Sequence, residues 1–367
     1  MVGARAAAGG EVRYEGGALM RQNRRMVLTR RPQHSETVTS EHFTLEASEI
    51  PDLAEGQFLV RNCWLGLDPA QRGWLREDPS YVTPVALGET MRGSAVGEVV
   101  ESRNSDFPVG AIVSGFFGWQ TFVIVTEPSD VWIVPGTLER FTSALGLLGT
   151  PGLTAYFGML DLARPKPGDW VVVTAAAGAT GSVAAQLARL AGATVVGVAG
   201  GPAKCEWLTQ VAGLDHAIDY HSENVAEQLS KLRPEGIDVV YDNVGGWLLD
   251  ACLDSIANGA TVVIGGAIAS RYSSDAMELR SVSNLPMVMT RRATVHGFLV
   301  LDYAHRYREA RERLAGFAAD GALTTSEDVV VGTLLDAPGT LQRLFDGSNL
   351  GKQVLEIGKP ELVRAAP

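Results

Sequence analysis

Residues 169–190 read DWVVVTAAAGATGSVAAQLARL, and this stretch decides the fold. The run 170–174 has the continuous β-branched character of a parallel strand that is buried on both faces. The turn after it carries Ala176-x-Gly178-x-x-Gly181, the glycine pattern of dinucleotide-binding turns with alanine in place of the first glycine. Residues 182–190 predict a helix, whose N-terminus would offer free N–H groups to the phosphates of a nucleotide.

The surroundings of this turn favour nucleotide binding over a purely structural loop. A second apolar strand, residues 194–199, follows the helix and completes the βαβ unit that the glycine pattern requires. Gly178 would let the backbone approach a pyrophosphate, and Gly181 would let the helix pack close to the strand. The sequence therefore predicts a dinucleotide-binding domain.

The composition is that of an ordinary globular enzyme of two domains. The chain has 367 residues, of which 46% are hydrophobic and 20% charged, enough for a sizeable core. The net charge of −11 argues against binding to nucleic acid or to an anionic membrane surface, and no run of about 18 apolar residues predicts a membrane span. Residues 1–25 are rich in Ala, Gly and Arg without an apolar stretch, which favours a disordered extension over a secretory signal.

Cysteine and histidine residues are scattered singly. Cys63, Cys205 and Cys252 form no CxxC pair, which indicates a reducing compartment, and we expect a cytoplasmic protein. None of them has a histidine at metal-ligand spacing, and the six histidines are dispersed. The sequence therefore shows no ligand set for a structural or catalytic zinc.

The pattern of elements changes twice along the chain. Residues 26–150 read as short strands and glycine turns, such as the alternating run 57–62, which predicts an antiparallel, β-rich domain. Residues 151–300 alternate between helices and strands, which predicts a doubly wound parallel sheet, a Rossmann domain. Residues 301–367 hold a helix and then strands, and we expect them to complete the β-rich domain. The predicted fold class is α/β, with the nucleotide domain inserted into a β-rich substrate domain.

Several further segments, taken in order, resemble one enzyme family. They are residues 66–73 (GLDPAQRG), 87–93 (LGETMRG), 148–156 (LGTPGLTAY), 242–246 (DNVGG) and 349–352 (NLGK), together with the AAAGATGS turn. Over residues 27–357 the chain resembles the zinc-independent medium-chain dehydrogenase/reductase superfamily, in its leukotriene B4 dehydrogenase/prostaglandin reductase branch. That branch includes plant alkenal double-bond reductases and bacterial curcumin-type reductases.

The resemblance implies a GroES-like fold for the β-rich domain and a reaction that needs no metal. Members of the branch reduce a C=C bond conjugated to a carbonyl group by hydride transfer from NADPH to the β-carbon. The resemblance therefore implies a small hydrophobic enone or enal as substrate, and it also implies a homodimer. A quinone reductase of the same fold and a catalytically weak NADPH-binding protein are the alternatives.

The end of the second strand indicates NADP(H) rather than NAD. NAD-specific domains place an acid there to bind the ribose 2′-hydroxyl, whereas residues 198–204 read VAGGPAK without a carboxylate. Lys204 is the expected cation for a 2′-phosphate, with an ordinary solvated surface lysine as the alternative. By resemblance, Tyr220 lies near the same phosphate or the adenosine.

The resemblance extends this site to other strand ends, where doubly wound sheets bind their ligands. It implies that Asn243 reaches the cofactor, that Asn349 caps the nicotinamide and that Phe298 lies along it. The alternatives are that Asn243 only shapes a turn and that Phe298 belongs to the core. The cofactor-binding residues predicted in this way are Gly178, Ala179, Thr180, Gly181, Lys204, Tyr220, Asn243, Gly265, Gly266, Ala267, Ile268, Tyr272, Phe298, Leu299, Val300 and Asn349.

Reduction of an enone needs a hydride at the β-carbon, a hydrogen-bond donor for the enolate oxygen and a proton for the α-carbon. Members of the branch often carry a tyrosine seven residues before the pair Gly297-Phe298, but Thr290 stands there. We therefore expect the cofactor ribose hydroxyl to support the enolate, aided by Tyr272, Tyr81 or water. Tyr272 is the first choice because its loop should adjoin the nicotinamide, and an exposed loop tyrosine is the alternative.

The expected substrate-binding residues come from the β-rich domain and are Asp68, Ala70, Tyr81 and Met91. Relatives often carry tyrosine where Ala70 stands, which predicts an enlarged pocket here. Met91 would offer an adaptable apolar wall. For Asp68 we expect an internal pair with Arg72 that shapes the loop, rather than direct catalysis.

Overall fold

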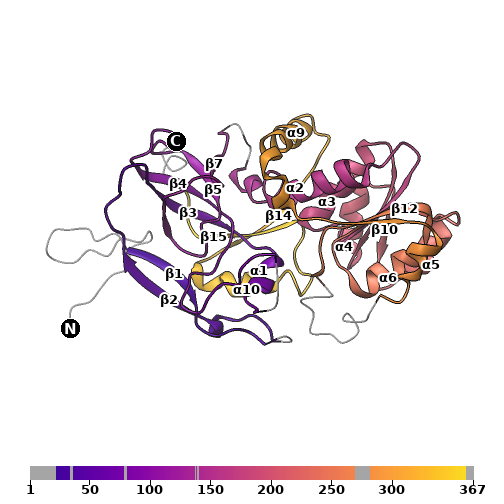
Figure 1. Ribbon diagram of the computed structural model, residues 1–367, viewed down its shortest axis with the longest axis horizontal. Coiled ribbons are helices and arrows are strands. Elements are labelled where there is room, and N and C mark those ends of the chain that lie inside the picture. Colours follow the sequence, from indigo (N-terminus) through magenta and orange to yellow (C-terminus); the bar gives the residue numbers. More distant parts are fainter. Residues whose placement is uncertain are drawn as a thin grey trace.

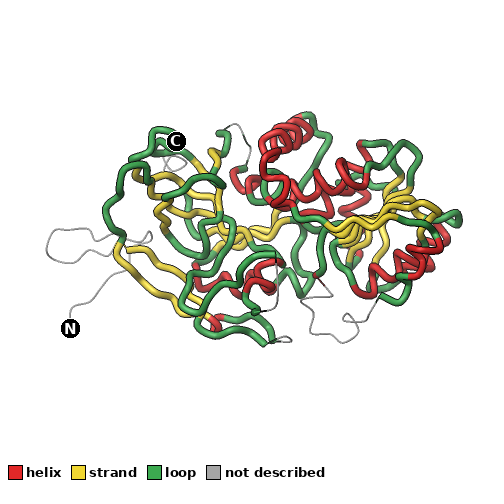
Figure 2. Tube along the Cα trace, in the orientation of Figure 1, coloured by secondary structure: helices red, strands yellow, loops and turns green. Residues whose placement is uncertain are grey.

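The structure is a computed structural model that describes residues 22–33, 36–77, 81–136, 138, 140–268 and 282–360. A β-rich half and a half that alternates between helices and strands lie side by side along the longest axis (Figure 1). Figure 2 shows helices on both sides of the parallel sheet in the second half, while strands and loops make up most of the first. The last strands of the chain, β14 and β15, run between the two halves (Figure 1).

The parallel sheet has six strands in the order β10-β9-β8-β11-β12-β13. Every neighbouring pair is parallel. Counted within the domain, this is the order 3-2-1-4-5-6 of a Rossmann fold, with the switch of direction between β8 and β11. The predicted doubly wound sheet is confirmed. Its strands are β8 (Trp170–Thr174), β9 (Thr194–Ala199), β10 (His216–Asp219), β11 (Ile237–Asp242), β12 (Ile256–Ile264) and β13 (Thr294–Gly297).

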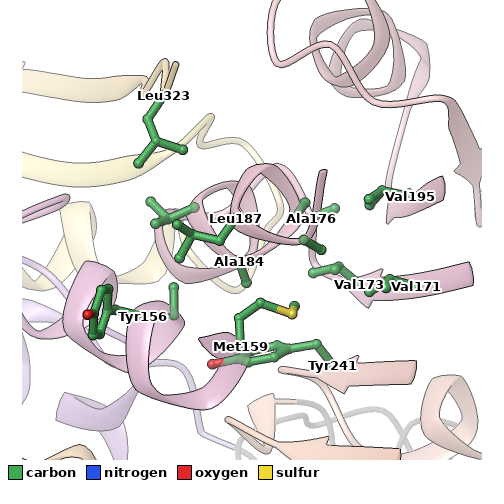
Figure 3. Packing of buried hydrophobic residues seen from close by; sticks show 14 of the residues in the cluster. Tyr156, Met159, Val171, Val173, Ala176, Ala184, Leu187, Val195, Tyr241 and Leu323 are labelled. Atoms are coloured by element: carbon green, nitrogen blue, oxygen red, sulfur yellow. The ribbon is translucent and has the colours of Figure 1, made fainter. Parts of the chain in front are cut away.

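Helices cover both faces of this sheet, which explains the continuous apolar run in β8. On one face, Val171 and Val173 pack with Ala184 and Leu187 of α3 (Figure 3). On the other face, Val172 belongs to a second buried cluster. Each such side chain contributes about 2 kcal/mol through burial. The helices are α3 (Ala179–Leu190), α4 (Pro202–Gln210), α5 (Val225–Leu232), α6 (Gly246–Asp254) and α8 (Pro286–Thr290).

The helix that precedes β8 changes its winding halfway. α2 (Thr150–Tyr156) starts after Gly149 with a proline in its first turn, where a missing N–H is tolerated. The chain continues as a π-helical segment, η3 (Phe157–Ala163), which ends at Arg164 in the left-handed region with φ 49°. Segments of this kind are frequent at functional sites.

The second sheet has the strand order β14-β15-β3-β4-β5-β7, with β6 paired to β3. Its neighbouring pairs are antiparallel except for β14 with β15. A separate hairpin joins β1 (Gln22–Leu28) and β2 (Phe43–Glu49). The strands of the sheet are β3 (Phe58–Gly66), β4 (Ala95–Ser102), β5 (Ile112–Gly115), β6 (Phe122–Val125), β7 (Trp132–Ile133), β14 (Glu327–Val331) and β15 (Lys352–Glu356).

Helix α9 (Tyr307–Ala319) contacts both halves. Its Ala310 and Leu314 are buried in the core cluster beside α3, and Leu323 joins the same cluster (Figure 3). Towards the β-rich half, the Arg311 guanidinium stacks on Trp132 of β7, 4.2 Å from the ring centroid. The domain limits at residues 150 and 300 stay a prediction.

The remaining helical elements are short. In the part of the chain that the structure describes, no helix is long and apolar enough to cross a membrane. The short helical elements are η1 (Ser40–His42), α1 (Ala70–Trp74), η2 (Phe141–Ala144), η4 (Val300–Arg306), η5 (Leu334–Asp336) and α10 (Ala337–Gln342).

Candidate functional site

The dinucleotide turn, residues 175–181, leads into α3 with free N–H groups. Gly178 is the N-cap, and within the described residues neither a side chain nor a carbonyl accepts the N–H groups of Ala179, Thr180 and Gly181. N–H groups at a helix N-terminus, where the dipole is positive, bind phosphate oxygens. The turn therefore fits the diphosphate of a dinucleotide.

Packing within this turn requires glycine at one position. A Cβ atom at Gly181 would overlap the carbonyl oxygen of Ala175, so α3 could not approach β8 this closely with another residue. Ala175 itself is in the left-handed region with φ 47°, which costs an L-residue about 1–2 kcal/mol. The tight bend is thus made at Ala175, one residue before the alanine that replaces the first glycine of the pattern.

The capping segment, residues 347–351, lies against the dinucleotide turn. Gly351 donates its N–H to the carbonyl of Ala177 at 2.8 Å and pairs with Gly178. Only glycine suits position 351, because φ is +71° and a Cβ atom would overlap a neighbouring carbonyl oxygen. The predicted cap Asn349 is held beside the turn, and its amide donates to the Gly351 carbonyl at 3.0 Å.

Lys204 and Tyr220 border the loop that follows β9. The Lys204 ammonium is partly buried and donates to the carbonyl of Gly347, in the capping segment, at 2.8 Å. Burial lowers the pKa of Lys204. The ring of Tyr220 stands close to Gly200, where a Cβ atom would lie 2.8 Å from the Tyr220 hydroxyl oxygen. The structure thus brings both residues to the strand end at which a 2′-phosphate was predicted to bind.

An acid also lies near this loop, although β9 itself ends without one. Asp219, the last residue of β10, accepts the N–H of Gly201 at 2.7 Å and the N–H of His221 at 3.0 Å. The bond from Gly201 is the main reason that the pKa of the Asp219 carboxyl is lowered. The loop after β9 is therefore shaped by an acid of the next strand, which the sequence argument did not consider.

The switch point between β8 and β11 is organised by Asp242. This residue is completely buried and accepts the hydroxyl of Thr174 at 2.7 Å and the N–H of Gly245 at 2.8 Å. Burial raises the pKa of Asp242, against the effect of these hydrogen bonds. Its carbonyl accepts the N–H of Gly265 at 2.7 Å, and the Asn243 amide donates to the Thr174 carbonyl at 2.8 Å. Asn243 and Gly265 thus meet at this point, where Asn243 also shapes the turn.

The loop after β12 begins at the same switch point. Gly266 has little space, because a Cβ atom there would lie 2.7 Å from the Asn243 carbonyl oxygen. Ala267 and Ile268 follow and are partly buried, with the Ile268 N–H 3.4 Å from that oxygen. Tyr272, the first choice as hydrogen-bond donor, lies outside the described residues.

Phe298 and its neighbours divide between core and surface. The Phe298 ring lies against Gly158 of η3 and makes a T-shaped contact with Tyr303, with 6.1 Å between the centroids. Leu299 is 37% exposed, and Val300 begins η4. Phe298 is partly buried and packs against the core, while Leu299 is accessible; the place of Phe298 along the nicotinamide stays a prediction.

Thr290 lies away from the carboxyl ends of the strands. It is exposed at the end of α8, where its hydroxyl donates to the Met287 carbonyl at 3.3 Å. α8 precedes β13 and so leads to the amino end of that strand, opposite the edge at which such sheets bind ligands. Thr290 therefore lies away from the strand ends at which the nicotinamide and the substrate are expected to bind.

The substrate turn, residues 67–74, is fixed by side chains from distant parts of the chain. Asp68 forms an ion pair with Lys352 of β15, so the expected pair with Arg72 is wrong. The Lys352 ammonium is buried beside Asp68 and requires an anion, whereas Arg72 reaches other partners. Arg72 donates to the Glu36 carbonyl at 2.7 Å and lies over the ring of Phe345, 5.6 Å from its centroid.

The other predicted substrate residues differ in accessibility. Ala70 begins α1 and is partly exposed, and Tyr81 is 43% exposed. Met91 is completely buried in the core cluster of the β-rich half, so it packs inside that half rather than lining open surface.

Sequence reasoning missed two residues that organise this region, Asp242 and Lys352. A single acid between an apolar strand and Asn-Val-Gly-Gly is a visible signal for Asp242. Both residues lie in segments that carry the family resemblance, 242–246 and 349–352, but only its burial distinguishes Lys352 from a surface lysine.

Comparisons with known proteins cover both halves of the chain. One matching family model is described as the N-terminal domain of oxidoreductase, over residues 24–134, and another as zinc-binding dehydrogenase, over residues 179–316. Among the described residues, no three His, Cys, Asp or Glu side chains are placed to share a metal ion.

Curated relatives extend over most of the chain. The NADPH-dependent curcumin reductase of Escherichia coli (strain K12) is 37% identical over 346 residues, which are 93% of this chain and 99% of the relative. The NADP(+)-dependent 2-alkenal reductase of Nicotiana tabacum is 36% identical over 313 residues, 85% of this chain and 90% of the relative. The chain belongs to the zinc-independent medium-chain dehydrogenase/reductase superfamily.

A solved structure of this superfamily supports the same placement. CurA from Vibrio vulnificus in complex with NADPH matches with a TM-score of 0.85 and 36% identity, over 92% of this chain and 100% of that one. The predicted membership of the alkenal reductase branch of the superfamily is confirmed by relatives at this level of identity.

Proposed function

We propose that this medium-chain reductase uses NADPH to reduce the C=C bond of α,β-unsaturated aldehydes and ketones. The observation that carries the proposal is the 37% identity to an NADPH-dependent curcumin reductase over 99% of that enzyme. The free N–H groups of the dinucleotide turn suit the phosphates of such a cofactor.

The chain offers groups that could bind the cofactor and stabilise the enolate oxygen. A reduced nicotinamide supplies a hydride when it is bound, and the protein holds it against the substrate. We propose that Asn349 helps to position that ring, while Lys204 and Tyr220 bind the 2′-phosphate end of the cofactor. A hydrogen-bond donor must stabilise the negative charge that develops on the substrate's carbonyl oxygen. Tyr272 is the first choice for this donor and Tyr81 the second.

The test is steady-state oxidation of NADPH with a panel of 2-alkenals, aromatic enones and quinones, with saturated aldehydes and ketones as controls. We expect kcat/KM for the best enone to exceed the values for the quinones and saturated controls at least about tenfold. NADH, assayed in parallel, should be the poorer cofactor. Activity with quinones alone would make the protein a quinone reductase, and tight NADPH binding without turnover would make it a binding protein.

We also propose a homodimer that forms along β13, the edge strand of the parallel sheet. Leu285, Met289 and Val295, on and before this strand, are 60%, 75% and 45% exposed. An exposed edge strand flanked by apolar side chains is a ready surface for pairing with a second copy. Light scattering should give the mass of a dimer for the wild type and of a monomer for Val295→Lys. A monomeric wild type at micromolar concentration would contradict the proposal.

The cytoplasm is the compartment that we propose. The cysteines are free thiols, and Cys63 and Cys252 are buried. Burial raises the pKa of the Cys63 thiol to about 12, which leaves it unreactive. Unpaired cysteines of this kind suit a reducing environment.

A further inference from the structure

Lys352, the first residue of β15, is 2% exposed although it carries a charge. Its ammonium donates to the carbonyl of Leu67 at 2.9 Å and pairs with the carboxylate of Asp68. Desolvation makes a buried ion pair a weak source of stability, so stability alone does not explain this one. Its location, between the dinucleotide turn and the substrate turn, points to another role.

The stem of Lys352 passes between two glycines. A Cβ atom at Gly66 would lie 3.5 Å from Cε of the lysine, and one at Gly146 would lie 3.4 Å from its Cβ. Gly66 is the last residue of β3, directly before the substrate turn. The lysine side chain is therefore directed at this turn with little freedom to point elsewhere.

The backbone at Lys352 is fixed beside β14, and the residue before it is fixed on the dinucleotide turn. The Lys352 N–H donates to the Ser326 carbonyl at 2.9 Å, and the preceding Gly351 donates to Ala177 of the dinucleotide turn at 2.8 Å. Gly351 thus holds the dinucleotide turn by a backbone bond, and Lys352 holds the substrate turn by its side chain. Any displacement of one turn relative to the other must strain or break one of these bonds.

We propose that Lys352 is a positioning residue, which sets the substrate turn relative to the bound nicotinamide through its pair with Asp68. The inference rests on the proposed function. It gives Lys352 a part in that reaction, although the residue touches neither substrate nor cofactor. The N–H of Asp68 donates to the side-chain oxygen of Gln71 at 3.0 Å, so the position of Asp68 also affects the position of α1. Reacting atoms must approach to about 3–3.5 Å, and misplacement by about 1 Å lowers the rate about 100-fold.

A double-mutant cycle separates positioning from stability. Lys352→Met leaves the partly exposed Asp68 carboxylate unpaired, and Asp68→Leu leaves the buried Lys352 ammonium unpaired, so each should lower the melting temperature. K352M/D68L removes both charges and should recover it. We expect kcat/KM for the enone to stay at least about tenfold below wild type in the double variant. The Kd for NADPH, from fluorescence titration, should stay within about threefold of wild type. A double variant that recovers both melting temperature and activity overturns the proposal.

Asp68→Asn tests the proposal even if the cycle variants fail to fold. The amide oxygen can still accept a hydrogen bond from Lys352, so this variant should keep at least about a third of the wild-type kcat/KM. A loss as large as that of Lys352→Met would mean that the carboxylate charge takes part in the chemistry, which overturns the proposal. The matched control is R61M/E98L, which removes an ion pair of 2.7 Å between β3 and β4 and should change kcat/KM less than about twofold.

Hydrogen exchange measures the same coupling without turnover. We expect NADPH to slow amide exchange in residues 67–75 at least about threefold in the wild type and to leave it unchanged in K352M/D68L. If the wild type binds NADPH but reduces no enone, the proposed function is contradicted, while the exchange experiment still tests the positioning role. Equal slowing in both proteins, or none in a wild type that binds NADPH, overturns the positioning role.

Discussion

The dinucleotide turn and the substrate turn are fixed by opposite means. In the first, glycine packing and backbone hydrogen bonds determine the geometry, and free N–H groups face the ligand. In the second, the Lys352 ammonium and the Arg72 guanidinium hold the chain by side-chain contacts. The glycine packing of the first lies within seven residues, although Gly351 also bonds to this turn, whereas the ion pair of the second joins residues 284 apart. Substitutions in the two regions should therefore affect different steps, one the binding of NADPH and the other the use of the substrate.

The largest effect is expected from Gly181→Ala in the dinucleotide turn. The added methyl group would meet the carbonyl of Ala175 and push α3 from β8. A strain of about 3 kcal/mol corresponds to about a 100-fold loss of NADPH affinity, measured by fluorescence titration. Gly316→Ala in α9, where a Cβ atom meets open space, is the control and should raise stability by about 0.5–1 kcal/mol. Unchanged NADPH affinity in Gly181→Ala would contradict the backbone account of this turn.

The same contrast explains what the sequence could predict. The apolar run of β8 and the glycine at position 181 are local signals. The first was interpreted correctly as a strand and the second as the residue that lets the helix pack close to it, although α3 begins at Ala179 rather than at 182. The bend at Ala175 was not predicted, because alanine adopts the left-handed region only where the surrounding structure holds it there.

Contacts between distant segments were beyond the sequence. Asp68 and Arg72 have the spacing of a pair on one helix face, but a buried lysine of β15 takes the carboxylate. Asp219 shapes the loop after β9 from the neighbouring strand, which no inspection of β9 reveals. Such partners depend on strand order, and strand order is set by tertiary packing.

Tyr272→Phe tests the proposed hydrogen-bond donor. Loss of the phenol hydroxyl should lower kcat for enones at least about tenfold, because it removes a donor from the developing oxyanion. The Kd for NADPH should not change. Tyr81→Phe is the matched control and should lower kcat less than about twofold if Tyr272 is the donor. The reverse order of effects would assign the role to Tyr81.

Lys204→Met should weaken NADPH about fivefold and leave NADH unaffected, because only NADPH carries the 2′-phosphate. Burial lowers the pKa of Lys204, so the ammonium loses its proton at a lower pH than an ordinary lysine. The preference for NADPH over NADH should therefore decline as the pH rises, and it should be independent of pH in Lys204→Met over that range. Parallel titrations of each protein with NADPH and NADH at several pH values measure this preference. An equal loss of NADPH and NADH affinity would show that Lys204 acts only through its bond to Gly347.

Ala70→Tyr should have the smallest effect, confined to the choice of substrate. The ring would fill space at the start of α1 and lower kcat/KM for bulky aromatic enones about threefold relative to short 2-alkenals. The ratio of the two kcat/KM values is the measurement, with Ala70→Ser as the control of similar size. A uniform loss for all substrates would place Ala70 outside the substrate-binding surface.

The central claim, hydride transfer to the β-carbon of an enone, is tested most directly with NADPH deuterated at the transferred position of the nicotinamide. The product of a conjugated ketone is isolated after complete conversion and examined by proton and deuterium NMR. We expect one deuterium on the former β-carbon of the saturated ketone. Deuterium on the carbonyl carbon of an allylic alcohol, or a reduced product without deuterium, would contradict the account.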